Sequence, residues 1–155
     1  MTYLEFLKTK IELAKESGFE INADDLNPAL KPHQKDAVAW ALKGGRRALF
    51  ESFGLGKTVQ EIEFCHQAAV HENGRALIVL PLGVKQEFTR DAVEVLGYEK
   101  PEYCRTMEEV KRSSSEIVIT NYERVRDGDI DPAYFSASSL DEASVLRSFG
   151  STAGL

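Results

Sequence analysis

The segment LFESFGLGKTVQEIEF, residues 49–64, decides the fold of this protein. It runs from apolar residues into a glycine turn, then to Lys57 and Thr58, and then into a helical pattern. A strand, a glycine turn and a helix in this order are typical of loops that hold a phosphate group, written G-x-x-x-x-G-K-[ST]. Gly56, Lys57 and Thr58 match the end of that pattern, whereas Glu51 stands where it begins with glycine.

The residue types in this segment suit the phosphates of a nucleotide. Glycines let the backbone approach closely, so that its N–H groups point at phosphate oxygens, and the helix that follows adds its positive dipole end. Lys57 supplies a compact positive charge, and the Thr58 hydroxyl can bind Mg²⁺. The alternative is a glycine turn followed by an unrelated lysine, but the flanking strand and helix favour the phosphate site. We therefore predict ATP and Mg²⁺ as cofactors, held by Phe53, Gly54, Leu55, Gly56, Lys57, Thr58 and Val59.

The rest of the chain alternates between strand and helix patterns. Glycine, asparagine, aspartate and proline interrupt residues 18–32, which predicts a loop. The alternation predicts an α/β fold with a mostly parallel sheet and helices on both faces. The expected helices are 2–16, 32–44, 57–70, 84–95, 106–113 and 141–150, and the expected strands are 46–50, 75–80, 101–105, 116–120 and 135–140.

Asp141 and Glu142 follow the last expected strand. ATP hydrolysis requires a carboxylate for the metal ion and a group that orients the attacking water. Asp141 can take the first role and Glu142 the second. Acidic residues also stabilise helix N-termini, which is the simpler interpretation of an isolated pair. Their position after a phosphate loop and alternating elements favours the catalytic interpretation, with Lys57 as the third catalytic residue.

Composition limits the other classes of function. The net charge of −6 is unusual for a stand-alone nucleic-acid binder, so any contact with DNA should use a local patch or another domain. Two distant cysteines, Cys65 and Cys104, fit a reducing cytoplasm rather than a disulfide framework. The sequence shows neither a secretion signal nor an apolar run of membrane-spanning length. The three histidines lack metal-ligand spacing.

Five segments in order resemble the first motor lobe of superfamily-two helicases and translocases, the DEAD/DEAH-box-like group. They are LKPHQKDAVAWAL, ESFGLGKT, LIVLPLGVKQEF, IVITNYERV and LDEAS. The nearest likeness is to phage-type helicases and chromatin-remodelling translocases. The resemblance implies a RecA-like ATP-binding lobe over residues 31–155, preceded by a helix-and-loop extension over residues 1–30.

The resemblance also implies roles for particular residues. Gln34 matches the glutamine that reads adenine, and Phe19 matches a ring that could stack on it, although a core phenylalanine is the simpler interpretation. Two turns match those that meet the backbone of a nucleic-acid strand, which would bind DNA through phosphates rather than bases. These turns contain Pro81, Leu82 and Gly83, and Thr120, Asn121 and Arg124.

Three departures from the family pattern stand out. Glu51 places negative charge near a phosphate site, and the strand before Asp141 reads SASSL where the family is apolar. Serine hydroxyls in a dry sheet need hydrogen-bond partners. The family's motor also has a second RecA-like lobe that completes the ATP site, and this sequence ends soon after LDEAS.

We therefore expect the ATP-binding half of a DNA helicase or translocase, weakly active alone and paired with a second lobe in cis or in trans. Two alternatives remain. One is a P-loop ATPase or phosphotransferase that does not act on DNA, and the other is a non-catalytic nucleotide-binding or interaction module.

Overall fold

A computed structural model describes residues 18–45, 47–50 and 57–141. The expected helix at residues 2–16 lies outside these residues, as does the helix expected at 141–150 except for Asp141, which is the last residue of a strand rather than the first of a helix.

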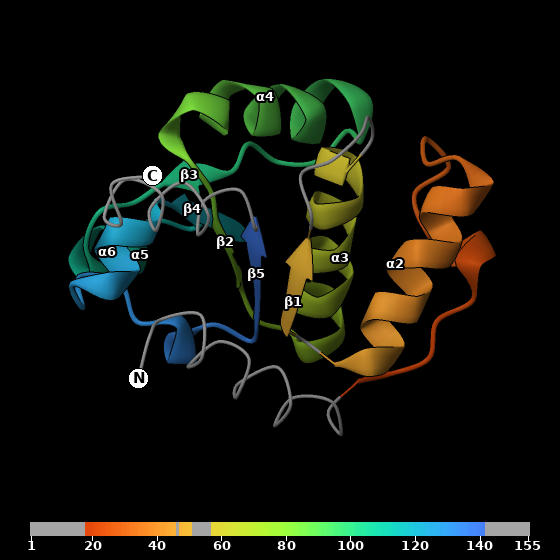
Figure 1. Cartoon of the computed structure of the whole chain (residues 1–155), viewed down its shortest axis with the longest axis horizontal. Coiled ribbons are helices and arrows are strands. Elements are labelled where there is room, and N and C mark those ends of the chain that lie inside the picture. Colours follow the sequence, from red (N-terminus) through yellow and green to blue (C-terminus); the bar gives the residue numbers. More distant parts are fainter. Residues whose placement is uncertain (1–17, 46, 51–56, 142–155) are drawn as a thin grey trace, which may run out of the picture.

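Five strands form one sheet in the order β1-β5-β2-β4-β3 (Figure 1). Every pair of neighbouring strands is parallel, so the prediction of a parallel α/β sheet is confirmed. Strand β5, the last in sequence, lies between β1 and β2, the first two. The strands are β1 (Arg47–Phe50), β2 (Ala76–Val79), β3 (Glu102–Tyr103), β4 (Ile117–Thr120) and β5 (Ala137–Asp141).

Local signals set the helix ends. Pro32 occupies the first position of its helix, and Gly45 ends that helix at a φ of 141°, a conformation that favours glycine. The Thr106 side chain caps another helix by accepting a hydrogen bond from the Glu109 N–H. The helices are η2 (Ala23–Asp25), α2 (Pro32–Gly44), α3 (Lys57–Glu72), η3 (Leu82–Val84), α4 (Lys85–Arg90), the π-helical η4 (Asp91–Val95), α5 (Met107–Arg112), α6 (Tyr122–Arg126) and η5 (Pro132–Tyr134).

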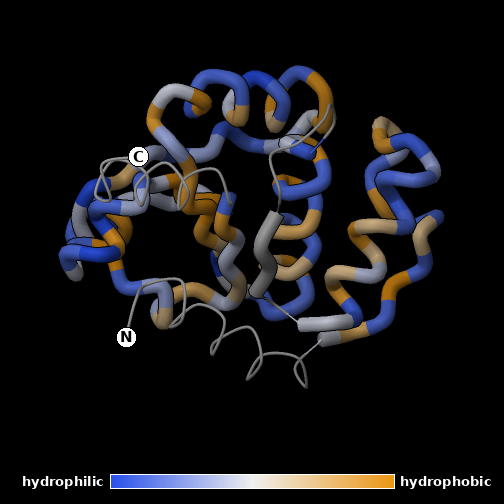
Figure 2. Tube along the Cα trace, in the orientation of Figure 1, coloured by the Kyte–Doolittle hydropathy of each residue, from blue (hydrophilic) through white to orange (hydrophobic). Residues whose placement is uncertain are grey.

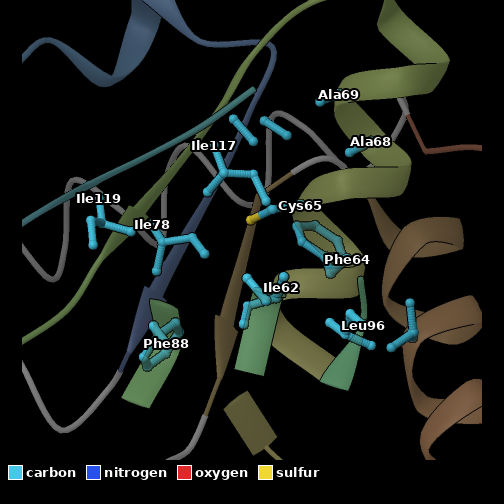
Figure 3. Close-up of a cluster of buried hydrophobic side chains, with 14 of the residues drawn as sticks. Ile62, Phe64, Cys65, Ala68, Ala69, Ile78, Phe88, Leu96, Ile117 and Ile119 are labelled. Carbon is cyan, nitrogen blue, oxygen red and sulfur yellow. The ribbon is translucent and has the colours of Figure 1, made fainter. Parts of the chain in front are cut away.

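Helices cover both faces of the sheet, as predicted. Alternate residues of β2 point to opposite faces, so that Ile78 joins one buried cluster and Leu77 joins the other. The first cluster packs the sheet against α3, α4 and η4 (Figure 3), and α2 joins this cluster by packing on α3. The second cluster packs the sheet against α5 and α6. Figure 2 shows hydrophobic residues along the central strands and hydrophilic residues over much of α4.

Residues 19–30, predicted as part of an extension, pack on the main core. Leu26 and Leu30 are buried within the first cluster, and the Asn27 N–H donates to Glu63 Oε2 at 2.8 Å. This loop and the sheet are therefore one packed unit.

Two elements of the structure differ from the predicted helices. The predicted helix 84–95 divides into α4 and a π-helical turn, in which the Leu96 N–H donates to the Asp91 carbonyl. Helix α6 follows β4 directly and has no counterpart among the predicted helices. Its 5 residues are too few to show a helical period in the sequence.

Candidate functional site

The phosphate-loop candidate lies where β1 passes into α3. Lys57, Thr58 and Val59 form the first turn of α3, a 16-residue helix, and all three are half-buried. The first-turn N–H groups of such a helix are available to an anion. The predicted contacts Phe53, Gly54, Leu55 and Gly56, together with Glu51, lie outside the described residues.

Asp141 lies at the carboxyl end of β5, beside the end of β1. In the register of these parallel strands it is the partner of Phe50, the last residue of β1. Asp141 is 6% exposed and has an interaction partner. Parallel strands place their carboxyl ends at one edge of the sheet, where α/β proteins bind ligands. Chain topology thus brings Asp141 to the strand end from which the glycine turn leaves. Its neighbour Glu142 lies outside the described residues.

A second carboxyl group, Glu61, lies behind this edge. It is four residues after Lys57 on α3, is 2% exposed, and accepts a hydrogen bond of 2.5 Å from the Ser139 hydroxyl. Burial raises the pKa of Glu61 well above its ordinary value, and the charge of Asp141 raises it further, whereas the Ser139 hydrogen bond lowers it. Glu61 is therefore held in its neutral form over a wider pH range than an exposed glutamate.

The serines of β5 thus find partners in a dry sheet. Ser139 bonds Glu61, and Ser138 also has an interaction partner, although both are buried. The unusual SASSL sequence is matched by a polar side chain on the helix that covers it. Sequence reasoning missed Glu61, although its spacing of four from Cys65 and eight from Ala69 places it on the apolar side of α3.

The donor set around this edge suits a magnesium ion held jointly with phosphates. Mg²⁺ prefers oxygen ligands and commonly uses one or two protein groups together with substrate phosphates. Thr58 supplies a hydroxyl and Asp141 a carboxylate. Within residues 18–45, 47–50 and 57–141, no three His, Cys, Asp or Glu side chains gather as a metal cluster.

Gln34 is already engaged in its own helix. It is 6% exposed, and its Oε1 accepts a hydrogen bond of 2.8 Å from the Lys31 N–H just before α2. This bond caps the helix. An adenine read through both ends of the amide would share Oε1 with that bond.

The two turns predicted to meet nucleic acid follow β2 and β4, which are neighbours in the sheet. In the first turn Pro81 is buried, whereas Leu82 is 52% exposed and Gly83 is exposed. Leu82 and Gly83 open η3, directly before α4. This turn therefore offers an accessible backbone.

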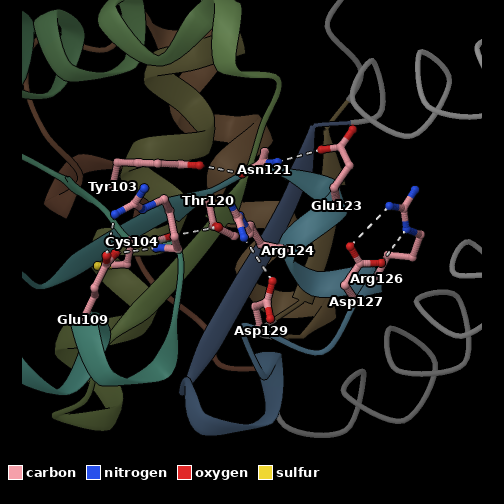
Figure 4. Close-up of polar contacts among 11 residues, drawn as sticks. Tyr103, Cys104, Glu109, Thr120, Asn121, Glu123, Arg124, Arg126, Asp127 and Asp129 are labelled. Atoms are coloured by element: carbon pink, nitrogen blue, oxygen red, sulfur yellow. Dashed lines mark hydrogen bonds and ion pairs between the residues drawn. The ribbon is translucent and has the colours of Figure 1, made fainter.

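The second turn holds a network of polar contacts (Figure 4). Thr120 is fully buried and donates its hydroxyl to the Cys104 carbonyl at 2.8 Å, so it has no surface for a phosphate in this structure. Asn121 accepts from the Tyr103 hydroxyl at 2.7 Å and donates to Glu123 Oε2 at 2.7 Å. Arg124 pairs with Asp129 at 3.2 Å, and this bond raises the pKa of its guanidinium.

Several aromatic and histidine side chains stack on one another beside α3. Phe19 stacks on His71 with ring centroids 3.7 Å apart and packs against the first buried cluster, as expected for a core phenylalanine. His66 Nδ1 lies 2.6 Å from Glu116 Oε2, and the His66 ring stacks on Tyr98 with ring centroids 3.9 Å apart. Burial and a hydrogen bond to Glu63 raise the pKa of Tyr98. The free cysteines Cys65 and Cys104 are both buried.

None of the helices in the described part of the chain has the length and apolar character needed to cross a membrane. A scan against protein-family models finds no match, and a search of curated proteins finds no matching sequence.

Proposed function

We propose that this chain is the ATP-binding half of a DNA helicase or translocase, with a RecA-like lobe that works together with a second lobe. The observation that carries the proposal is the pairing of Phe50 with Asp141 in register. It brings a carboxylate to the strand end that leads into the glycine turn and Lys57. A parallel sheet with helices on both faces is the scaffold on which such an edge is built.

Each of these residues has its own role in the binding and hydrolysis of ATP. The Lys57 ammonium and the first-turn N–H groups of α3 hold the phosphates of ATP and neutralise their charge. Thr58 and Asp141 hold the magnesium ion, which would stabilise the negative charge that develops during phosphoryl transfer. Glu142 orients the attacking water and takes its proton. Glu61, whose pKa is raised by burial, lies behind β5 and bonds Ser139.

The turns after β2 and β4, at the same edge of the sheet, bind the nucleic acid. Leu82 and Gly83 are exposed there, and Arg124 keeps its positive charge beside Asp129. Contacts of this kind grip phosphates without reading bases, as a motor that moves along a strand requires. Closure of the second lobe over this edge would couple hydrolysis to movement.

The decisive experiment is magnesium-ATP binding by Lys57→Ala, measured by calorimetry. Hydrogen bonds to charged groups contribute roughly 1.5–3 kcal/mol, so the affinity should fall about tenfold to a hundredfold. Lys35→Ala on α2 is the matched control, because it removes the same charge from another helix and should bind like the wild type. Equal affinities in the wild type and Lys57→Ala would refute the phosphate site.

A further inference from the structure

A pocket lies between α4 and the edge strand β3, outside the residues assigned above. Its volume is about 380 Å³, within the range of small-ligand sites. Residues from α4, from the segment leading into β3, and from β3 and β4 line it. Since Arg90 and Lys100 are exposed, the pocket opens on the protein surface.

The lining is basic in a protein whose net charge is −6. Lys85, Arg90 and Lys100 contribute positive charges, and Glu102 contributes the one negative charge among the lining residues. Glu102 accepts a hydrogen bond of 2.5 Å from Ser113, which ends α5. This concentration of positive charge is the local patch that an acidic protein needs in order to attract a polyanion.

The three cationic groups differ in how they are held. Lys85 Nζ lies 4.9 Å from the centroid of the Tyr103 ring, a cation–π contact that fixes its position. Arg90 Nε lies 3.5 Å from Asp91, which leaves its terminal nitrogens able to donate to another acceptor. Lys85 and Arg90 are the two ends of α4, roughly 7 Å apart along the helix axis at 1.5 Å per residue.

The residues that line the pocket favour recognition of a phosphate group over recognition of a base. Tyr103 is the aromatic side chain of the lining, and Lys85 covers its ring. A base could stack there only after Lys85 moved, whereas a phosphate would meet Lys85 directly. The Thr89 hydroxyl donates to the Lys85 carbonyl at 3.0 Å, so it is already used within the helix.

The pocket adjoins both turns predicted to meet nucleic acid. Lys85 follows η3 of the first turn directly, and the Tyr103 hydroxyl donates to Asn121 of the second (Figure 4). A strand that crosses the carboxyl ends of β2 and β4 would therefore reach the pocket next. We propose that Lys85, Arg90 and Lys100 bind phosphodiester groups of a single nucleic-acid strand in this pocket between α4 and β3. The choice of partner rests on the proposed function.

The test is binding of a short fluorescein-labelled thymidine oligonucleotide to the full chain, followed by anisotropy over a series of salt concentrations. Lys85→Ala/Lys100→Ala should weaken binding about tenfold or more at low salt, because two charge-assisted contacts are lost. The slope of log affinity against log salt should fall by about 1.4, or about 0.7 for each lysine on a single strand. Lys35→Ala/Lys111→Ala, which has the same net charge but changes other helices, should keep the wild-type affinity and slope.

Three results would overturn the proposal. They are no binding by the wild type, an equal loss in both double variants, and displacement of the oligonucleotide by inorganic phosphate at equal concentration, which would indicate a site for the free ion. Magnesium-ATP binding by the wild type is measured by calorimetry, in an assay that contains no oligonucleotide. A failure of the nucleotide site and a failure of this pocket are therefore measured separately.

Discussion

Strands β2 and β5 are neighbours in the sheet and both are wholly buried, yet their chemistry differs. Strand β2 reads ALIV, whereas β5 reads ASSLD. Ile78 and Ser139 are partners in register, so the two kinds of side chain occupy equivalent positions. The apolar strand needs only close packing, whereas the polar strand needs a partner for each buried group. Ser139 obtains its partner from Glu61, and β5 can therefore carry Asp141 at its buried end.

The largest effect is expected in the apolar strand. Ile78 is fully buried, so Ile78→Ala removes packed methyl groups and leaves a cavity. The free energy of unfolding should fall by about 2–5 kcal/mol, measured by urea denaturation. Val70→Ala, at a residue that is 56% exposed on α3, should change it little. A loss at Ile78 no larger than that at Val70 would contradict the packing described for β2.

A smaller effect is expected in the polar strand. Ser139→Ala deletes the hydroxyl bonded to Glu61 Oε1, and this leaves a buried carboxyl group without that partner. The expected loss of unfolding free energy is about 1–3 kcal/mol by the same method. Ser114→Ala, at an exposed serine between α5 and β4, is the control and should change the stability little. If both serine variants lose equal stability, the buried pair has no special role.

The third prediction concerns the pH dependence of stability. The difference between the variant and the wild type should be smallest at acid pH. The folded pKa of Glu61 is raised above the unfolded value of 4.5, so the folded state binds its proton more tightly. The resulting stability is complete below pH 4.5 and is lost as pH rises towards the folded pKa. Glu61→Gln imitates the neutral carboxyl group and cannot ionise. Its free energy of unfolding relative to the wild type should therefore rise with pH.

Urea denaturation at a series of pH values measures this difference. Glu87→Gln, at an exposed glutamate of α4, is the control and should follow the wild type at every pH. A difference between Glu61→Gln and the wild type that stays flat or falls with rising pH would show that the pKa of Glu61 is not raised in the folded protein.

Local patterns predicted most of the elements because those elements depend on neighbouring residues. Pro32, Gly45 and Thr106 mark helix ends through their own backbone or side-chain chemistry. The α/β class followed from alternation, and the parallel sheet with helices on both faces is confirmed. The short α6 and the π-helical end of the 84–95 helix were not found, because each spans less than two helical turns.

The sequence by itself determined the order of the five strands and of the longer helices between them, the position of Lys57 and Thr58 after a strand, and the placement of Asp141 near the end of another. These features need only the local periodicity and chemistry of the chain. The tertiary structure decided that β5 lies between β1 and β2, that Asp141 meets the end of β1, and that Glu61 partners Ser139. It also buried Thr120 and gathered Lys85, Arg90 and Lys100 around one pocket. These are contacts between residues distant in sequence, and strand order and packing set them rather than any local preference.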